Sequence, residues 1–511
     1  MIISLSVLVI TIIVSGTYAL YKAQLSKNIG VNTTTHGLAY YINYVKGTDI
    51  TAATLNPSTS YEGGASSDIE FWKKDDSYDI YGKIELTVNT IGTNLSNSPA
   101  LKYAVVNNGN VLKEGSLKGT TSGSKVTILK NLYLEQTKQI YTVYVWLDNS
   151  EELGNISNES LSISVDCTAS LQKEPTAADT IISLYTSAAK VTATNNSITY
   201  NTAPSVSLMN DRLGGTTTSL DGGNIRYYGA SPNNYIYFNC SDYSNQTSST
   251  CETWRIIGVF DGKLKLIRGS QIGKYSWDNK NTSTGAENNS GKNDWTTARL
   301  MKLLNPRDYY KVDSNDNNLG QSLYYNSASG KCYSGQNNAT VDCDFTSTGI
   351  KNDETRNMIA ETTYNLGGWN SNTVYPNLMY EKERGTTVYT GRPTTPWTGK
   401  IALAYTSDYG YAADLNQCKD KTLYDYNNST CTSNNWMKAI ITNNGSNSGW
   451  LLTPYCSTSS NVWYVYPVGN VYFNYTVYSA FGAVPVLSLS SELGIESGGD
   501  GSSSNPYKLS A

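Results

Sequence analysis

Charged residues are scarce in this chain of 511 residues. Lysine, arginine, aspartate and glutamate make up 16% of the sequence, and the formal net charge is −4. Proteins that bind nucleic acid neutralise its phosphates with clustered lysine and arginine side chains. The sequence contains no such basic cluster, so nucleic acid is not an expected partner.

Histidine is almost absent, because His36 is the only one, in a segment that we expect to form a loop. A Ser-His-Asp triad, a Cys-His pair or a histidine-based zinc site would have to use this residue. The pattern His-Glu-x-x-His does not occur. We therefore expect no catalytic residue of these kinds and no cofactor, while hydrolysis by paired carboxylates stays open.

No Cys-x-x-Cys occurs among the eight cysteines, which leaves zinc ribbons and thioredoxin-like chemistry without support. Proximity favours disulfides within three local pairs, although sequence alone allows many connectivities. The pairs are Cys240 and Cys251, Cys332 and Cys343, and Cys418 and Cys431. Cys167 and Cys456 are left over. Disulfides are typical of exported proteins.

An apolar run from Leu5 to Val14 lies close to the N-terminus. It is short for a membrane span and has the length of a signal-peptide core, and small residues precede a cleavage position after Ala19. We interpret residues 1–19 as a signal peptide, or alternatively as a membrane anchor that is retained. In either case we expect an extracellular protein at the cell surface, with membrane contact only through this segment.

Tyrosine is abundant, with 41 residues against 6 phenylalanines, which is typical of β-rich, hydrogen-bonding surfaces. Between residues 20 and 168, segments with alternating side chains are separated by turns rich in glycine, asparagine and serine. These segments are 78–88, 125–129, 139–147 and 160–165. Helical periodicity is missing there, so the pattern predicts a β-sandwich.

The same region carries five short motifs: Gly16–Ala19, Leu20–Asn28, Leu38–Ile42, Tyr78–Tyr81 and Tyr144–Asp148. Together they resemble the TasA/camelysin family of surface and biofilm-matrix fibre proteins. The resemblance implies that residues 20–168 form an exported jelly-roll-like sandwich. It also implies a homopolymer in which the segment Leu20–Asn28 is donated to a neighbouring copy. Camelysins are described as proteases, but no metal-ligand set for that activity is present here.

The rest of the chain mixes helical and strand signals. Residues 169–205 are interpreted as a linker with a short helix over 177–185. Two apolar runs, 254–260 and 263–268, flank Asp261-Gly262, a dipeptide typical of tight hairpin turns. Helical spacing followed by a proline predicts a helix over 294–306. We therefore expect a β-rich multidomain protein whose part from 206 to 511 is α+β.

A β-hairpin near the C-terminus is the strongest candidate for a binding site. Apolar side chains alternate with tyrosine and asparagine over 463–466 and 471–474, on either side of a turn at 467–470. Tyrosine and asparagine give contact area and hydrogen bonds at low entropic cost. A half-buried hairpin with an ordinary polar face is the alternative. The candidate ligand-binding residues are Trp463, Tyr464, Tyr466, Asn470, Tyr472, Asn474, Tyr475 and Tyr478.

Around this hairpin, eight residues have the spacing of a known class of domain: Trp450, Pro454, Trp463, Val465, Gly469, Gly482, Pro485 and Leu487. They resemble the C-type-lectin-like ligand-binding domains of surface proteins from gut Firmicutes, which include targets of diversity-generating retroelements. The sequence departs at Val484, where that family commonly has arginine. The resemblance implies that residues 206–511 form a C-type-lectin-like domain whose C-terminal hairpin meets the ligand and is diversified in sequence.

Together these features predict a cell-surface binding protein or adhesin, in which a sandwich stalk presents a lectin-like head to a protein or glycan. The alternative is an exported enzyme of the formylglycine-generating type, which shares the fold class and depends on a reactive cysteine pair such as Cys418 and Cys431. Free thiols would favour the enzyme, and disulfides the binding protein. Calcium is an open alternative to a solvated loop at Asp313-Ser314-Asn315-Asp316-Asn317-Asn318, which has oxygen ligands at alternate positions.

The N-terminus gives a first testable prediction. Because the apolar run is short and small residues precede Ala19, N-terminal sequencing of protein from its native host should begin at Leu20. A sequence that begins at Met1 would show instead that the segment is retained as an anchor.

Overall fold

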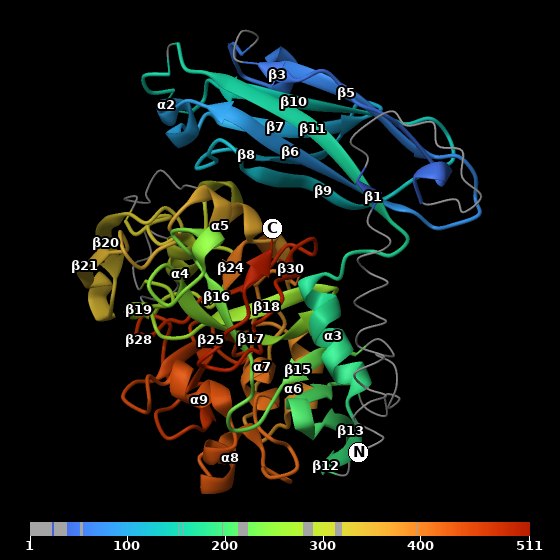
Figure 1. Cartoon of the computed structure of the whole chain (residues 1–511). Coiled ribbons are helices and arrows are strands. Elements are labelled where there is room, and N and C mark those ends of the chain that lie inside the picture. Colours follow the sequence, from blue (N-terminus) through green and yellow to red (C-terminus); the bar gives the residue numbers. More distant parts are fainter. Residues whose placement is uncertain are drawn as a thin grey trace. The chain divides into compact units, whose positions relative to one another are not determined.

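The computed structural model describes residues 23–24, 38–51, 55–151, 153–156, 158–196, 198–212, 223–279, 290–311, 319–394 and 396–510. The expected signal peptide (1–19) and the calcium alternative at Asp313–Asn318 lie outside the described residues. The chain divides into two compact units, 1–174 and 175–511, each described by itself below. Figure 1 draws it from blue to red along the sequence. The prediction of a β-rich protein is confirmed, because several antiparallel sheets dominate and the helices are short.

Unit 1 is a β-sandwich. One sheet has the strand order β1-β11-β6-β9, with β3 paired to β11, and the other has the order β2-β5-β10-β7-β8, with β4 paired to β10. Its elements are β1 (Ala23–Gln24), η1 (Leu38–Tyr41), β2 (Ile42–Val45), β3 (Ile50–Thr51), β4 (Pro57–Ser58), η3 (Tyr61–Gly63), β5 (Ala65–Lys73), β6 (Tyr81–Ile91), α2 (Thr93–Asn97), β7 (Leu101–Asn107), β8 (Asn110–Ser116), β9 (Lys125–Tyr133), β10 (Ile140–Asp148) and β11 (Leu161–Ser170).

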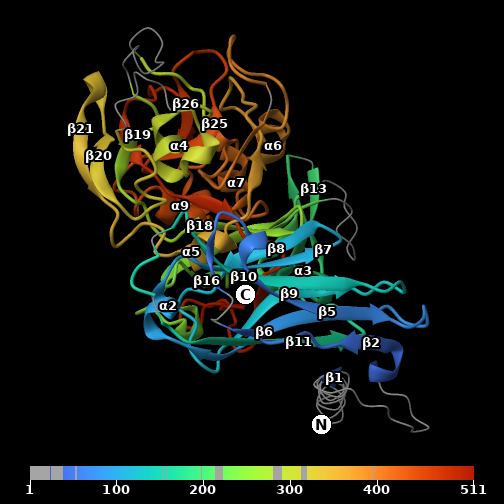
Figure 2. The same cartoon turned by 90° about the horizontal axis from the view of Figure 1, so that it is seen from above.

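The core of unit 1 lies between these sheets, and alternation along the strands creates it. In β6, Ile84, Leu86 and Val88 are fully buried, while the residues between them are only half-buried. They pack with Ile69 of β5 and Val143 of β10 from the other sheet, and the layers of long strands can be followed in Figure 2. One buried face per sheet explains why the periodicity of the sequence predicted these strands correctly.

The expected donor segment, Leu20–Asn28, is described only at Ala23 and Gln24. These two residues form β1 and pair antiparallel with Ala169 and Thr168 of β11 in the same chain. The donation of this segment to another copy therefore stays a prediction.

Unit 2 contains a large sheet with the order β12-β13-β14-β15-β17-β18-β29-β24, with β16 paired to β17, and a five-stranded sheet with the order β19-β28-β25-β26-β27. Its strands are β12 (Val191–Asn195), β13 (Ile198–Ala203), β14 (Leu208–Asn210), β15 (Ile225–Tyr227), β16 (Tyr235–Phe238), β17 (Glu252–Phe260), β18 (Lys263–Arg268), β19 (Lys274–Ser276), β20 (Ser329–Tyr333), β21 (Thr340–Asp344), β22 (Thr362–Tyr364), β23 (Trp397–Gly399), β24 (Ile401–Ala402), β25 (Gly449–Pro454), β26 (Val462–Val465), β27 (Val471–Tyr472), β28 (Ala480–Gly482), β29 (Val486–Ser488), β30 (Gly494–Ile495) and β31 (Leu509–Ser510).

Its helices are short. They are α3 (Ala177–Ser187), η4 (Pro204–Val206), η5 (Tyr243–Asn245), α4 (Arg299–Leu304), η7 (Arg307–Tyr309), η8 (Gln336–Asn338), α5 (Asp353–Met358), α6 (Pro376–Glu383), α7 (Thr406–Tyr411), η9 (Leu423–Asp425), α8 (Ser429–Ser433) and α9 (Trp436–Ile441). The helix expected over 294–306 is confirmed only for its middle part, α4. In the described residues, no helix combines the length and apolar character needed to cross a membrane.

Two further local predictions hold. Strands β17 and β18 form a hairpin through Asp261 and Gly262, whose φ angles of 48° and 72° are the left-handed values that this turn requires. The helix expected near 177–185 is α3, which begins at the N-cap Thr176 with a reciprocal capping box to Asp179.

The segment 169–205, which we expected to be a linker, is divided between the units. Residues up to Ser170 belong to β11, and Ile181 and Tyr185 of α3 are fully buried in the core of unit 2. Helix α3 packs against β15, β17 and β18, as Figure 1 shows. Its apolar face explains why it is a core element of unit 2.

The three predicted disulfides are present: Cys240–Cys251, Cys332–Cys343 and Cys418–Cys431. The two remaining cysteines are free; Cys167 is buried in unit 1 and Cys456 is half-buried. Burial raises the pKa of the Cys456 thiol to about 11, so this thiol is protonated at neutral pH.

The pairing gives a prediction for the protein in solution. When the protein is denatured without reduction, iodoacetamide should modify only Cys167 and Cys456, because the other cysteines are in disulfides. Peptide mapping by mass spectrometry measures this, with a reduced sample as the control. Label on any of the other six cysteines in the unreduced sample would contradict the pairing.

Candidate functional site

The C-terminal hairpin is present as predicted. Strand β26 pairs with β25 on one side and with β27 on the other, and Tyr464 lies opposite Tyr472. The turn is closed by a hydrogen bond from the Tyr466 amide to the Asn470 carbonyl (2.8 Å) and by one from Gly469 to Tyr466 (2.8 Å).

Three of the proposed site residues do not reach the surface. Trp463 and Tyr464 are 0% and 1% exposed, and Asn470 is 4% exposed. The expectation of one core face and one open face fails for β26, because both faces of this strand are covered. Tyr464 packs in one hydrophobic core with Trp450, and Trp463 packs in another with Val465 and Leu451. The hydroxyl of Tyr464 donates to Oδ1 of Asn474.

The other proposed residues stay accessible. Tyr466 is 41% and Tyr475 is 46% exposed, Asn474 is exposed, and Tyr472 and Tyr478 are half-buried. Tyr472 is central among them, because its ring makes an edge-to-face contact with that of Tyr466 at 6.0 Å.

Sequence reasoning missed one member of this group, Tyr424. Its ring is 42% exposed and contacts that of Tyr472 edge to face at 5.3 Å, and the Tyr472 hydroxyl donates to the Tyr424 hydroxyl (3.2 Å). This bond raises the pKa of Tyr472. Tyr424 lies in η9, between Cys418 and Cys431. The sequence shows that Tyr424 lies inside a short disulfide loop, but it does not show that this loop packs against the hairpin at Tyr472.

We call Tyr424, Tyr466, Val468, Tyr472 and Tyr475 the tyrosine surface. Within the part of unit 2 that the structure describes, six large apolar or aromatic side chains are exposed, and four of them belong to this surface: Tyr424, Tyr466, Val468 and Tyr475. Large exposed apolar groups that gather in one place mark interaction sites more often than scattered ones do.

Both halves of the tyrosine surface are attached to helix α7. The hydroxyl of Tyr409 donates to the Gly469 carbonyl in the hairpin turn (2.6 Å), and the hydroxyl of Tyr426 donates to the Gly410 carbonyl (3.1 Å). Tyr426 follows Tyr424 in the disulfide loop. Gly469 has φ +109°, and a Cβ there would lie 2.9 Å from the Thr432 side chain, so glycine is required at this turn.

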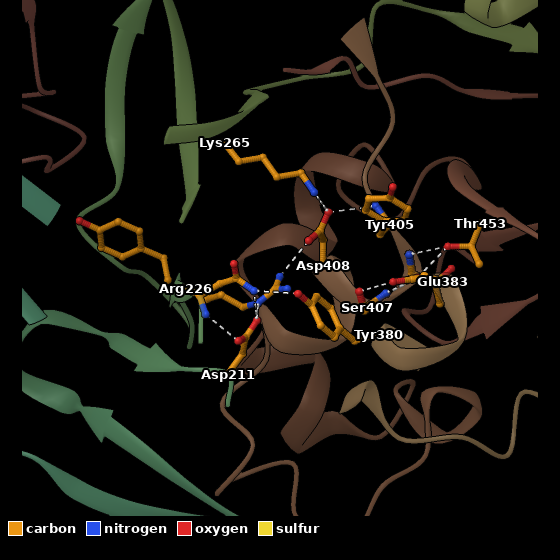
Figure 3. A network of polar contacts seen from close by, with 12 residues as sticks. Asp211, Arg226, Lys265, Tyr380, Glu383, Tyr405, Ser407, Asp408 and Thr453 are labelled. Carbon is orange, nitrogen blue, oxygen red and sulfur yellow. Dashed lines mark hydrogen bonds and ion pairs between the residues drawn. The ribbon is translucent and has the colours of Figure 1, made fainter. Parts of the chain in front are cut away.

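Helix α7 is in turn held by a buried ionic network, shown in Figure 3. Asp408 accepts a hydrogen bond from Nη1 of Arg226 (2.8 Å) and contacts Nζ of Lys265. It also accepts from the Tyr405 amide (3.0 Å), one of the free N–H groups at the start of the helix. Arg226 pairs with Asp211 as well. The four charges balance and are all buried.

Burial and ion pairing shift the pKa values of Asp408 and Lys265 in opposite directions. Burial opposes ionisation of Asp408, but the charges of Lys265 and Arg226 outweigh it and lower the pKa of Asp408 to about 2. Burial lowers the pKa of Lys265, while Asp408 opposes this shift. We conclude that Asp408 is ionised at neutral pH and that the members of this network pair with one another.

A second polar cluster joins α6, α7 and β25. Oε1 of Glu383 accepts hydrogen bonds from the Ser407 amide (3.0 Å) and from the Thr453 hydroxyl (2.8 Å), as Figure 3 shows. Burial raises the pKa of Glu383. Glu383 is 0% exposed, so we assign it a structural role.

In the described residues, no cluster of side chains is arranged to hold a metal ion, and neither of two small cavities is lined by the tyrosine surface. In the described ranges, no group of three or more histidine, cysteine, aspartate or glutamate side chains is arranged to hold a metal ion. A cavity of about 30 Å³ in unit 1 is lined by Tyr81, Asn131 and Glu174 among others, and one of about 10 Å³ in unit 2 by Trp277, Trp295 and Arg392 among others. Each has room for a water molecule or two.

Comparison with known proteins identifies no family. No family model matches the chain, and no curated protein matches it. Among solved structures, the chain has a weak likeness to an HCR/D mutant, with 12% identity, 51% of this chain and 75% of that chain covered, and a TM-score of 0.14. A receptor binding domain of botulinum neurotoxin mosaic serotype C/D gives 11% identity, 52% and 75% coverage, and a TM-score of 0.13. Likeness at this level carries no argument about fold or function.

The ionic network generates a stability prediction. Asp408→Asn removes a carboxylate partner from each of two buried cations, Lys265 and Arg226, so it should lower the free energy of unfolding by about 3–5 kcal/mol. Urea denaturation at pH 7 measures the change. Asp342→Asn is the control, because Asp342 pairs with Lys331 at the surface with its side chain 88% exposed, and no measurable change is expected there.

The same residue sets a pH dependence. The pKa of Asp408 falls from 3.8 to about 2 on folding, so its contribution, roughly 2 kcal/mol, is present above pH 3.8 and lost as the pH falls through 2. The wild type should therefore lose more stability than Asp408→Asn between pH 5 and about 2. Equal slopes of stability against pH would rule out this assignment.

Proposed function

We propose that this protein is an exported cell-surface binding protein or adhesin, in which unit 1 is a jelly-roll-like stalk and unit 2 a C-type-lectin-like head. The tyrosine surface of unit 2 binds a protein or glycan ligand. The observation that carries the proposal is the concentration of exposed tyrosine side chains on two segments, each of which is hydrogen-bonded to helix α7.

Rigid attachment supports a binding role because it lowers the entropic cost of association. The hairpin and the disulfide loop meet at Tyr472 and Tyr424. Neither segment has to be ordered when a ligand arrives. Tyrosine also adds few rotatable bonds for the area that it contributes.

The cysteines support export and favour binding over catalysis. Disulfides persist in oxidising compartments, so three of them are consistent with a location outside the cytoplasm. An enzyme of the formylglycine-generating type would need Cys418 and Cys431 as a reactive pair. These cysteines form a disulfide and are 0% and 1% exposed.

The lectin-like part of the proposal is supported by where the matching residues lie. Trp450 and Pro454 are in β25, Trp463 and Val465 in β26, and Gly469 in the hairpin turn. Val484, at the position where arginine is common, is 3% exposed in the same core as Trp463. An apolar core therefore surrounds the position at which this chain departs from the pattern.

Substitution of the most exposed tyrosines tests the proposal. Tyr466→Ser with Tyr475→Ser should leave the melting temperature nearly unchanged, because both side chains are more than 40% exposed. The same variant should lose binding to immobilised extracellular glycoproteins such as mucin, fibronectin and fibrinogen, measured by surface plasmon resonance.

Two controls accompany this experiment. Tyr78→Ser in unit 1 is matched in residue type and exposure (45%) and should bind as the wild type does. Tyr464→Ala should instead lower the free energy of unfolding of unit 2 by about 3–5 kcal/mol, because a buried ring is removed. Wild-type binding by the folded double variant would refute the proposed site.

A further inference from the structure

Several polar groups at and next to the tyrosine surface are bonded within the protein. Oδ1 of Asn474 accepts from the buried Tyr464 hydroxyl, and the Tyr472 hydroxyl donates to that of Tyr424. Farther along the hairpin, Nδ2 of Asn461 donates to the Phe473 carbonyl (2.8 Å), and Asn470 is only 4% exposed. Of the two amides that the sequence predicted as ligand contacts, Asn470 is therefore buried, and Asn474 has its Oδ1 occupied by the Tyr464 hydroxyl.

What remains for a partner is mostly ring and aliphatic surface. Val468, in the turn, is 51% exposed, and Tyr466, two residues before it, is 41% exposed. Tyr424 and Tyr466 both contact Tyr472 edge to face, at 5.3 and 6.0 Å. The members of this surface are uncharged. Their contacts with a partner will thus be dominated by apolar area.

This composition separates two classes of ligand. A sugar carries several hydroxyl groups on every ring, and each one that is buried without a hydrogen bond costs free energy. A site for sugars therefore needs several accessible polar groups that converge. The centres of protein–protein interfaces are instead depleted of charge and enriched in tyrosine and other aromatic residues, and a few such residues carry most of the affinity.

We propose, building on the proposed function, that the ligand of the tyrosine surface is a folded protein, recognised through an uncharged, apolar patch on its surface. Tyr424, Tyr466, Val468 and Tyr472 contact that patch through their rings and the valine methyl groups. The disulfide loop is then as much a part of the binding site as the hairpin.

The test compares three forms of the same probes: intact mucin, fibronectin and fibrinogen, the same glycoproteins after enzymatic deglycosylation, and the released glycans printed on a slide. The full chain should bind an intact glycoprotein and its deglycosylated form with affinities within about twofold, and should not bind the glycans. Because the contacts are uncharged, the affinity should change by less than about twofold between 0.1 and 0.5 M NaCl.

Variants that remove only a hydroxyl sharpen the comparison. Tyr466→Phe and Tyr475→Phe keep the rings and should keep wild-type affinity, whereas Tyr424→Ala should weaken binding by about tenfold or more. A loss of affinity in the phenylalanine variants would indicate that the tyrosine hydroxyl groups form hydrogen bonds with the ligand, as a glycan site requires. The melting temperature of Tyr424→Ala shows whether the loop stays folded.

The outcomes separate this inference from the function on which it rests. Binding that follows the released glycans, or that disappears on deglycosylation, overturns the protein partner but leaves a binding protein with a glycan ligand. Binding that is strongly weakened by salt overturns the uncharged contact. Absence of tyrosine-dependent binding to every form overturns both the inference and the proposed function.

Discussion

The pairing of Asp408 with Arg226 and Lys265 is a buried interaction that links three elements of unit 2. Each charge would be costly to bury alone, so each fixes the position of its partners. Arg226 is on β15, Lys265 on β18 and Asp408 on α7. The network therefore sets the orientation of α7 against the large sheet. Helix α7 carries that orientation outward through Tyr409 and Gly410 to the hairpin turn and the disulfide loop.

Two-sided burial is the second organising constraint of unit 2. Six consecutive residues of β17, from Trp254 to Val259, are buried, as are the four residues of β26. Strands of this kind have no outer face for polar residues. Tyrosine can occupy such positions because its ring packs as a hydrophobic group while its hydroxyl finds a partner, as Tyr464 does with Asn474.

These constraints explain which features the sequence could predict. The sandwich strands of unit 1 were predictable, because one buried face gives a period of two, as in β6. The Asp261-Gly262 turn and the short helix near 177–185 depend on a few adjacent residues, and local disulfides depend on proximity. The open face of β26 was predicted wrongly, since alternation of valine with tyrosine does not report what covers the tyrosine. Tyr424 could not be assigned to the site, because its contact with Tyr472 joins segments 48 residues apart.

The way in which the hairpin turn is held has an evolutionary consequence. Tyr409 binds the carbonyl oxygen of Gly469, a main-chain atom that is present whatever side chains flank it. Positions 466, 468 and 475 point outward and contribute little to the core. Their side chains are therefore nearly free of selection for folding, so the residues at these positions can be replaced while the scaffold is inherited unaltered.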